Sequence, residues 1–381
     1  MHKPDAVIAG HICLDITPKF PEAEVSETAA GIQHPASLLI PGALVTVDGV
    51  DIHPGGVVAN TGLAMQYFGN DVSLMGKIGT DVFGTMLLDL LNQWGTGNGM
   101  VVSQTASTSY SIVLALPGQD RIFLHDPGAN HTFTGDDVDY SLIGQSRLFH
   151  FGYPPQMRRM YEQDGDELVC MFKKIDELGV LTSLDLASVD DRSAAALADW
   201  EVILSRVLPH VDFFLPSYEE LAWMLDRGTL DRLRSVSTAG DPLEELSMEE
   251  HVRPLAEKAL SLGVKVVVIK CGAKGLYGKT ADGAGFSRLC GKAASKGIGG
   301  FESWRGAAQV QRAIPPRMIR SATGAGDTCI AAFLTALLRD YDFPHALAIA
   351  AAAGSSCLES WDALAGLKSF EELETVLIND Q

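Results

Sequence analysis

The sequence predicts a doubly wound α/β fold, a mainly parallel sheet with helices on both faces. Short apolar or β-branched runs alternate with segments of helical period over most of the 381 residues. This alternation is typical of consecutive βαβ units. The composition, 46% hydrophobic and 20% charged, is that of a folded chain that can bury a large core.

The strands expected in the main sheet are short and mostly apolar. They cover residues 6–9, 72–75, 148–151, 181–186, 212–215 and 264–269. The clearest helical period between them lies at 81–94, for which Thr80 is the expected N-cap and Gly95 the expected stop. The capping-box spacing at 247–250 predicts another helix over about 248–262.

Two segments interrupt this alternation. Residues 16–54 are rich in Pro, Gly and Thr and lack a helical period, and residues 109–126 predict a hairpin that turns at 117–120. Together they predict a small β-layer apart from the main sheet. The polar stretch 227–246 and the Gly/Lys-rich stretch 280–316 are expected to be surface insertions.

The charge balance excludes some partners. Twenty-nine Lys and Arg against 48 Asp and Glu give a net charge of −19, which repels nucleic acids and anionic membranes. No apolar run is long enough to span a bilayer, and the run at 6–9 is too short for a signal peptide. The six cysteines have no CxxC spacing, so we expect reduced thiols and a cytoplasmic protein.

Residues 273–280 match a loosened Walker A pattern after a strand. A phosphate-binding loop of that kind must open a helix, whereas turn-forming residues follow here. We therefore expect a hairpin connection at this point.

A stronger phosphate-binding signal is Thr-Gly-Ala-Gly-Asp-Thr-Cys at 323–329, followed by an apolar helical run. Small residues let a ligand approach the backbone, and a helix start offers free N–H donors to a phosphoryl group. On these residues alone, Asp327 is either part of a site or simply a first-turn residue that suits the helix dipole.

A second glycine-led helix start lies at Gly55-Gly56, with Asn60 near its first turn. It is either a tight turn before a core helix or one wall of a cleft. Asp15 follows the first strand, where open α/β sheets bind ligands.

Taken in order, these segments resemble the ribokinase family, the PfkB-type carbohydrate kinases, from about residue 6 to residue 362. Further matching segments lie at 76–84, 126–130 and 266–275. The resemblance implies one ribokinase-like domain over 1–381, in which the segments 16–54 and 109–126 form a lid over the substrate.

The resemblance also implies an activity, the ATP-dependent phosphorylation of a hydroxyl on a small sugar or sugar derivative, with Mg²⁺ as the metal. A nucleoside kinase of the same fold and a non-catalytic sugar- or nucleotide-binding homologue are the alternatives.

The family pattern assigns a role to each matching residue. Asp327 corresponds to the general base, and Gly324, Ala325 and Gly326 correspond to a backbone anion hole. The residues that match substrate-binding positions are Asp15, Gly55, Gly56 and Asn60. Those that match nucleotide-binding positions are Ser217, Lys270 and Gly272, and Glu220 matches a glutamate that organises magnesium.

Four positions depart from the family pattern. Cys13 replaces a sugar-contacting Asn, Ser217 replaces the Asn of an Asn-x-x-Glu motif, and the pattern usual after Asp185 is missing. Ser321 replaces an Asp that binds potassium in many relatives, so we expect weak or absent potassium activation.

The resemblance implies a homodimer through the lids as well. The lid segment 16–54 carries more apolar side chains than a small exposed layer usually tolerates. They are Leu38, Leu39, Ile40, Leu44, Val45 and Val47.

Overall fold

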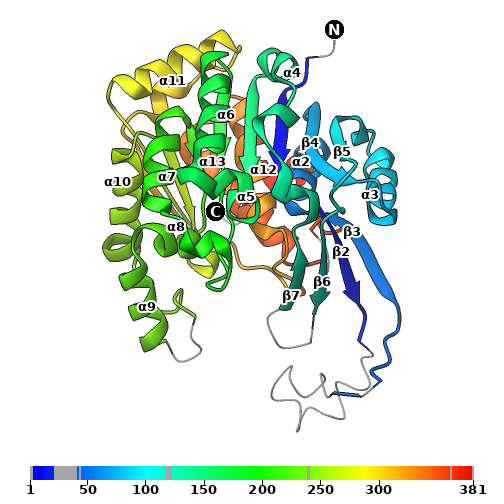
Figure 1. Ribbon diagram of the computed structural model, residues 1–381. Coiled ribbons are helices and arrows are strands. Elements are labelled where there is room, and N and C mark those ends of the chain that lie inside the picture. Colours follow the sequence, from blue (N-terminus) through cyan, green and yellow to red (C-terminus); the bar gives the residue numbers. More distant parts are fainter. Residues whose placement is uncertain are drawn as a thin grey trace.

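The computed structural model describes residues 3–20, 41–42, 44–115, 122–237, 241–360 and 363–379. A large sheet lies between two groups of helices, and a small sheet projects from this body (Figure 1). The predicted α/β class with a separate β-layer is therefore confirmed.

The large sheet has nine strands in the order β13-β12-β11-β10-β9-β8-β1-β4-β5. The strands from β11 to β5 pair in parallel, whereas β12 and β13 run antiparallel. Their bounds are β1 Ala6–Gly10, β4 Val72–Gly79, β5 Met100–Ser103, β8 Leu148–Gly152, β9 Leu181–Leu184, β10 Phe213–Phe214, β11 Val266–Lys270, β12 Leu276–Thr280 and β13 Ala308–Gln311. All residues of β1 and β8 are buried, as expected for parallel strands covered on both faces.

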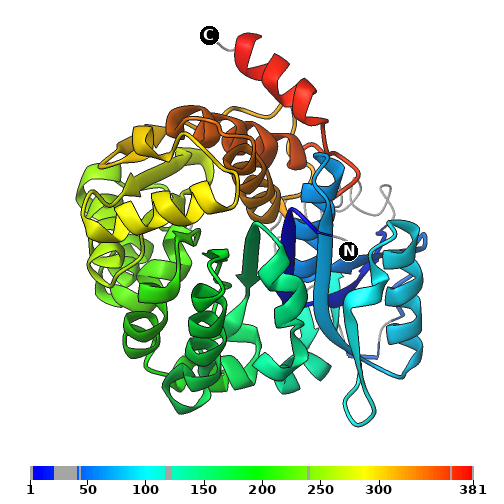
Figure 2. The same cartoon turned by 90° about the horizontal axis from the view of Figure 1, so that it is seen from above.

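Helices cover both faces of the sheet, and each face has its own apolar core. In Figure 2 the two groups of helices lie on opposite sides of the strands. One core contains residues of α2 Gly56–Tyr67, α3 Val82–Gln93, α11 Ala284–Ser295, α12 Ala325–Leu338, α13 Phe343–Cys357 and α14 Phe370–Asn379. The other contains residues of α4 Tyr140–Gln145, α5 Arg158–Tyr161, α6 Asp166–Glu177, α7 Trp200–Val207, α8 Tyr218–Leu225, α9 Arg227–Val236 and α10 Arg253–Ser261.

The small sheet has four strands in the order β3-β2-β6-β7. They are β2 Cys13–Pro18, β3 Val50–Gly55, β6 Tyr110–Leu114 and β7 Ile122–Asp126. The β6–β7 pair is the predicted hairpin, and the first segment enters the sheet at Cys13, before residue 16. The apolar run 38–40 and the turn 117–120 lie outside the described residues.

Several local expectations are corrected by the structure. Asp81, rather than Thr80, caps α3, because its carboxylate accepts a hydrogen bond from the N–H of Gly84 at 2.8 Å. The stretch 280–316 is not only an insertion, since it contains α11 and the sheet strand β13. Likewise, α9 occupies the first half of the polar stretch 227–246.

The Walker-like residues form the expected hairpin. Lys270, the last residue of β11, pairs with Leu276 at the start of the antiparallel β12, and residues 272–274 make the turn. No helix begins there to present N–H groups to a phosphate.

Candidate functional site

The candidate site lies at the carboxyl ends of the parallel strands, where β1 and β8 adjoin. From β1 the chain proceeds through β4 and β5 to one side, whereas β8 to β11 extend to the other. Open α/β sheets bind ligands at such a switch point. His11 follows β1 and Tyr153 follows β8, and their rings lie 5.9 Å apart.

Asp327 is the central side chain of the site. It lies in the first turn of α12 and is 4% exposed. Asn60 Nδ2 donates to Asp327 Oδ2 at 2.9 Å, and Thr61 Oγ1 donates to Oδ1 at 3.3 Å. The hydroxyl of Tyr153 is 2.8 Å from both carboxylate oxygens. Burial raises the pKa of Asp327, and the hydrogen bonds from Asn60 and Tyr153 oppose that rise.

The glycines before Asp327 are required by the local geometry. Gly324 is the N-cap of α12 with a φ of 75°, and a Cβ at this position would lie 2.3 Å from Ala363 Cβ. Only glycine meets both demands without strain. Within the part of the chain that the structure describes, no side chain caps α12, and the N–H of its first residue, Ala325, donates to the carbonyl of Ala322 at a long 3.3 Å. A helix start without a side-chain cap is suited to binding an anion.

Lys270 lies beside this helix start. A Cβ on Gly326 would be 3.5 Å from Lys270 Cε. Lys270 Nζ donates to Asp185 Oδ1 at 2.8 Å and to the carbonyl of Leu215 at 2.6 Å. Burial raises the pKa of Asp185 to about 8, with Lys270 opposing and Glu220 adding to the rise. A cation and two acidic groups thus lie close to the glycine-rich turn.

Ser217 and Glu220 form a capping box at the start of α8. The Ser217 N–H donates to Glu220 Oε2 at 2.7 Å, and the Glu220 N–H donates to Ser217 Oγ at 3.2 Å. Ser217 also bridges to Lys270, the end of β11. Gly272, with a φ of 51°, begins the turn after that strand. Ser217, Glu220, Lys270 and Gly272 therefore lie at the carboxyl ends of the parallel strands, on the same side of the sheet as Asp327.

Asp15, Gly55 and Gly56 lie where the small sheet meets the body. A Cβ on Gly55 would fall 2.2 Å from Asp15 Oδ2, so the carboxylate covers the bare glycine backbone. Gly56 has a φ of 79° and begins α2, the helix that carries Asn60. Burial raises the pKa of Asp15, and the nearby Asp327 carboxylate adds to the rise. Cys13 Sγ donates to Asp15 Oδ1 at 3.3 Å.

Sequence reasoning missed three contributors: His11, His125 and Tyr153. The Nε2 atoms of His11 and His125 are 3.2 Å apart, and His125 Nδ1 is 3.0 Å from Ser111 Oγ. Burial lowers the pKa of both histidines. The signal that could have identified His11 and Tyr153 is their position directly after two buried strands.

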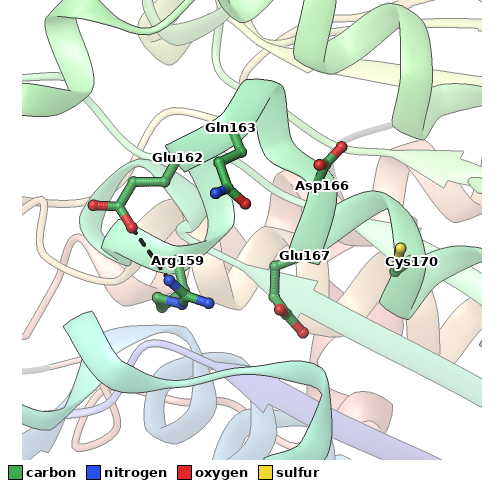
Figure 3. A pocket seen from close by; sticks show the side chains of 6 residues that line it. All are labelled: Arg159, Glu162, Gln163, Asp166, Glu167 and Cys170. Atoms are coloured by element: carbon green, nitrogen blue, oxygen red, sulfur yellow. Dashed lines mark ion pairs between the residues drawn. The ribbon is translucent and has the colours of Figure 1, made fainter.

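A separate hollow lies on the surface between α5 and α6. Figure 3 shows its lining, in which Arg159 and Glu162 form an ion pair with a distance of 3.6 Å. The exposed Cys170 and the acidic Asp166 and Glu167 complete it together with Gln163. None of the predicted site residues lines this hollow.

The fold and site together define a class, the ribokinase-like α/β proteins. A family described as pfkB family carbohydrate kinase matches residues 25–368, so the chain belongs to this family of phosphotransferases. Among curated relatives, fructokinase-2 of Oryza sativa is 26% identical over 203 residues, covering 51% of this chain and 57% of the relative. Fructokinase-1 of Zea mays is 33% identical over 102 residues, which are 26% of this chain and 32% of the relative. The alignments thus span about half or less of these relatives.

Solved structures show the same fold over nearly the whole chain. Ribokinase of Arabidopsis thaliana, complexed with ribose and ATP, has a TM-score of 0.68 at 19% identity and covers 99% of both chains. Ribokinase of Giardia lamblia has a TM-score of 0.69 at 15% identity with full coverage of both. A putative ribokinase II of E. coli with ATP and Mg²⁺ has a TM-score of 0.66 at 18% identity, covering 99% of both chains. Within the described residues, no helix has the length and apolar character needed to cross a membrane.

Proposed function

We propose that this protein transfers the γ-phosphoryl group of ATP to a hydroxyl of a small sugar or sugar derivative. The observation that carries the proposal is Asp327, a buried carboxylate in the first turn of a helix without a side-chain cap. A base and an anion-binding backbone then share one helix start, as phosphoryl transfer to a hydroxyl requires.

In the proposed mechanism, Asp327 accepts the proton of the attacking hydroxyl. The N–H groups of Gly324, Ala325 and Gly326 bind the oxygens of the transferring phosphoryl group as their charge grows. Lys270, beside Gly326, adds a positive charge on the same side. The raised pKa of Asp327 makes it a stronger base than an exposed aspartate.

The nucleotide side can accommodate magnesium held mainly by phosphates. Among the residues described, no three His, Cys, Asp or Glu side chains gather as a metal-binding group. Magnesium commonly takes one or two carboxylates and completes its shell with waters and phosphates, where it neutralises phosphate charge. Glu220, as the resemblance implied, and the neighbouring Asp185 are the carboxylates available for this. Ser217 and Gly272 would lie along the nucleotide.

The acceptor side favours a neutral polyhydroxyl compound. Asp15 and Asn60 offer an acceptor and an amide to hydroxyl groups, and the bare backbone of Gly55 and Gly56 lets Asp15 and His11 lie close against it. Burial lowers the pKa of both His11 and His125, and His125 adds to the decrease at His11, so the positive charge that would attract an anionic substrate is disfavoured on both rings. These features favour an acceptor with several hydroxyl groups, which is why we place a sugar before a nucleoside.

We also propose that the whole chain works as one domain, with the small sheet as a lid over the acceptor and as a dimer interface. On β7, Ile122, Phe123 and Leu124 are exposed by 37%, 49% and 53%, and Leu44 and Val47 are exposed as well. Among the described residues this strand is at the edge of the small sheet, the position at which a strand of a second chain commonly adds. Leu38, Leu39 and Ile40 lie outside the described residues.

The expected setting is the cytoplasm. All six cysteines lie in the described part of the chain without forming a disulfide, and four of them are buried. Free thiols persist in a reducing compartment.

The experiment that tests the function is a panel of neutral sugars, sugar acids and nucleosides, assayed for acceptor-dependent ADP release with MgATP. We expect turnover with a neutral sugar. Turnover only with a nucleoside would favour the alternative kinase, and ATP binding without any turnover would favour the non-catalytic homologue.

A further inference from the structure

Tyr153 donates to the carboxylate that the proposed mechanism uses as its base. The residue follows β8, at the switch point of the sheet, and its hydroxyl is 2.8 Å from each oxygen of Asp327. Its backbone is left-handed, with a φ of 65° and a ψ of 40°, a conformation that costs energy for a bulky residue. The fold therefore maintains an unfavourable backbone conformation at the position that directs this hydroxyl toward Asp327.

With Tyr153 in place, hydrogen-bond donors are bound to both oxygens of the Asp327 carboxylate. Two carboxylate oxygens offer about four lone-pair sites. Asn60 takes one site on Oδ2 and Thr61 one on Oδ1, and the Tyr153 hydroxyl is shared between both oxygens. Because the Tyr153 hydroxyl lies at the same distance from both oxygens, an acceptor hydroxyl can take that position on Asp327 only if Tyr153 leaves it.

Tyr153 is the donor that can leave. Asn60 and Thr61 are buried in the middle of the core helix α2, where they are 6% and 0% exposed. Tyr153 is partly exposed, lies in a connection outside the helices and strands, and places its hydroxyl by rotation about two side-chain torsions. Its ring centroid lies 5.9 Å from that of His11.

We propose that Tyr153 is a placeholder for the acceptor hydroxyl, which keeps water off Asp327 until a sugar displaces it. This inference depends on the proposed kinase function. With the sugar bound, its hydroxyl proton passes to Asp327 while its oxygen bonds to the γ-phosphorus of ATP. The bond from that phosphorus to the bridging oxygen breaks, and its electron pair leaves with ADP. Water at the same position would instead hydrolyse ATP to ADP and phosphate, and no phosphorylated sugar would form.

The first test removes only the hydroxyl, in Tyr153→Phe, and uses Tyr161→Phe as the matched control. Tyr161 is a buried tyrosine on α5 that does not contact Asp327. ADP release from MgATP is measured without any acceptor, and KM is measured with the best acceptor of the panel. We expect acceptor-free hydrolysis to rise about tenfold in Tyr153→Phe and the KM for the acceptor to fall, because no hydroxyl must be displaced. The Tyr161 variant should match the wild type.

Acceptor-free hydrolysis within about twofold of both wild type and control, with an unchanged KM, would overturn the placeholder role. A second readout needs no turnover. The pKa of Asp327 is measured by ¹³C NMR of labelled aspartate carboxyls, and we expect it to be higher in Tyr153→Phe because a donor to the charged form is lost. An unchanged pKa would show that the hydroxyl does not bind Asp327 and would also overturn the inference. If the wild type phosphorylates no acceptor, the proposed function fails, and the titration still decides whether Tyr153 binds the carboxylate.

Discussion

Asn60 Nδ2 and Asp327 Oδ2 are 2.9 Å apart although 267 positions separate the two residues along the chain. This bond joins the middle of α2 to the first turn of α12, and the two helices pack against each other on one face of the sheet. It brings the glycine-led start of α2, which borders the acceptor side, to the glycine-rich turn that borders the phosphate side.

Asp327→Asn should abolish most of the turnover, because an amide cannot accept the hydroxyl proton. We expect kcat to fall by roughly 10²–10⁴-fold. Nucleotide affinity should change little, since the backbone donors of 324–326 remain. Steady-state kinetics and nucleotide titration check both statements, with the exposed Asp190→Asn as control. Near-normal kcat in the Asp327 variant would reject this residue as the base.

Asp15→Ala should weaken acceptor binding. The carboxylate is half-buried on the small sheet and near enough to Asp327 for the two charges to interact, and a lost hydrogen bond to a charged group costs about 1.5–3 kcal/mol. Asp51→Ala is the matched control, because Asp51 is also on the small sheet but forms an exposed ion pair with Lys19. Isothermal titration with the acceptor is the measurement. Equal affinities for both variants would contradict a role of Asp15 in binding.

The sequence could predict those parts of the site that are contiguous. Gly324, Gly326 and Asp327 form one motif whose chemistry depends on a local turn. Residues that are adjacent in the sequence are therefore enough to predict it. Tyr153 and His11 could not be assigned in this way, because their proximity follows from β1 and β8 being adjacent strands, and that strand order has no local signature.

The same distinction between local and long-range signals explains the fold-level errors. The helix α11 was missed because glycines and small residues dilute its pattern, although Phe286, Leu289 and Ala293 have the three- and four-residue spacing of a buried face. The strand β13 is a short edge strand with alternating exposure, and only its pairing with β12 identifies it.

Gly324→Ala should reduce stability and activity together. The φ of 75° costs a non-glycine residue about 1–2 kcal/mol, and the added methyl would collide with Ala363. Gly283→Ala is a matched control, since Gly283 is the N-cap of α11 with a φ of −84°, and a methyl group added there would meet no atom within 4 Å. Urea unfolding and kcat are the measurements. Equal stability of the two variants would show that the turn before Asp327 relaxes freely.

His150 should make the fold sensitive to acid. It is fully buried on β8, and burial lowers its pKa to about 3, with Lys270 adding to the decrease. In the unfolded chain the histidine has its ordinary pKa of about 6.5. At pH values between about 6.5 and 3, only the unfolded chain therefore binds the proton, and the free energy of unfolding falls by about 1.4 kcal/mol for each unit by which the pH falls. In His150→Gln, the free energy of unfolding should no longer show this decrease between about pH 6 and pH 4.

The measurement for this prediction is the free energy of unfolding in urea at a series of pH values. The surface variant His345→Gln serves as control and should keep the wild-type slope. A slope in His150→Gln equal to that of the wild type would mean that another group causes the acid sensitivity.

Replacing the exposed apolar residues of β7 should disrupt the proposed dimer. The double variant Ile122→Ser, Leu124→Ser removes two large apolar side chains from a strand that, among the described residues, is at the edge of the small sheet. We expect the wild type to have a dimer mass by light scattering at micromolar concentration, and the double variant to have a monomer mass. Val236→Ser, at an exposed apolar site on α9 in the main body, should leave the dimer intact. A monomeric wild type would end the proposal. A dimeric double variant would place the interface elsewhere, because burial of these side chains is the main driving force for association that the described part of the small sheet offers.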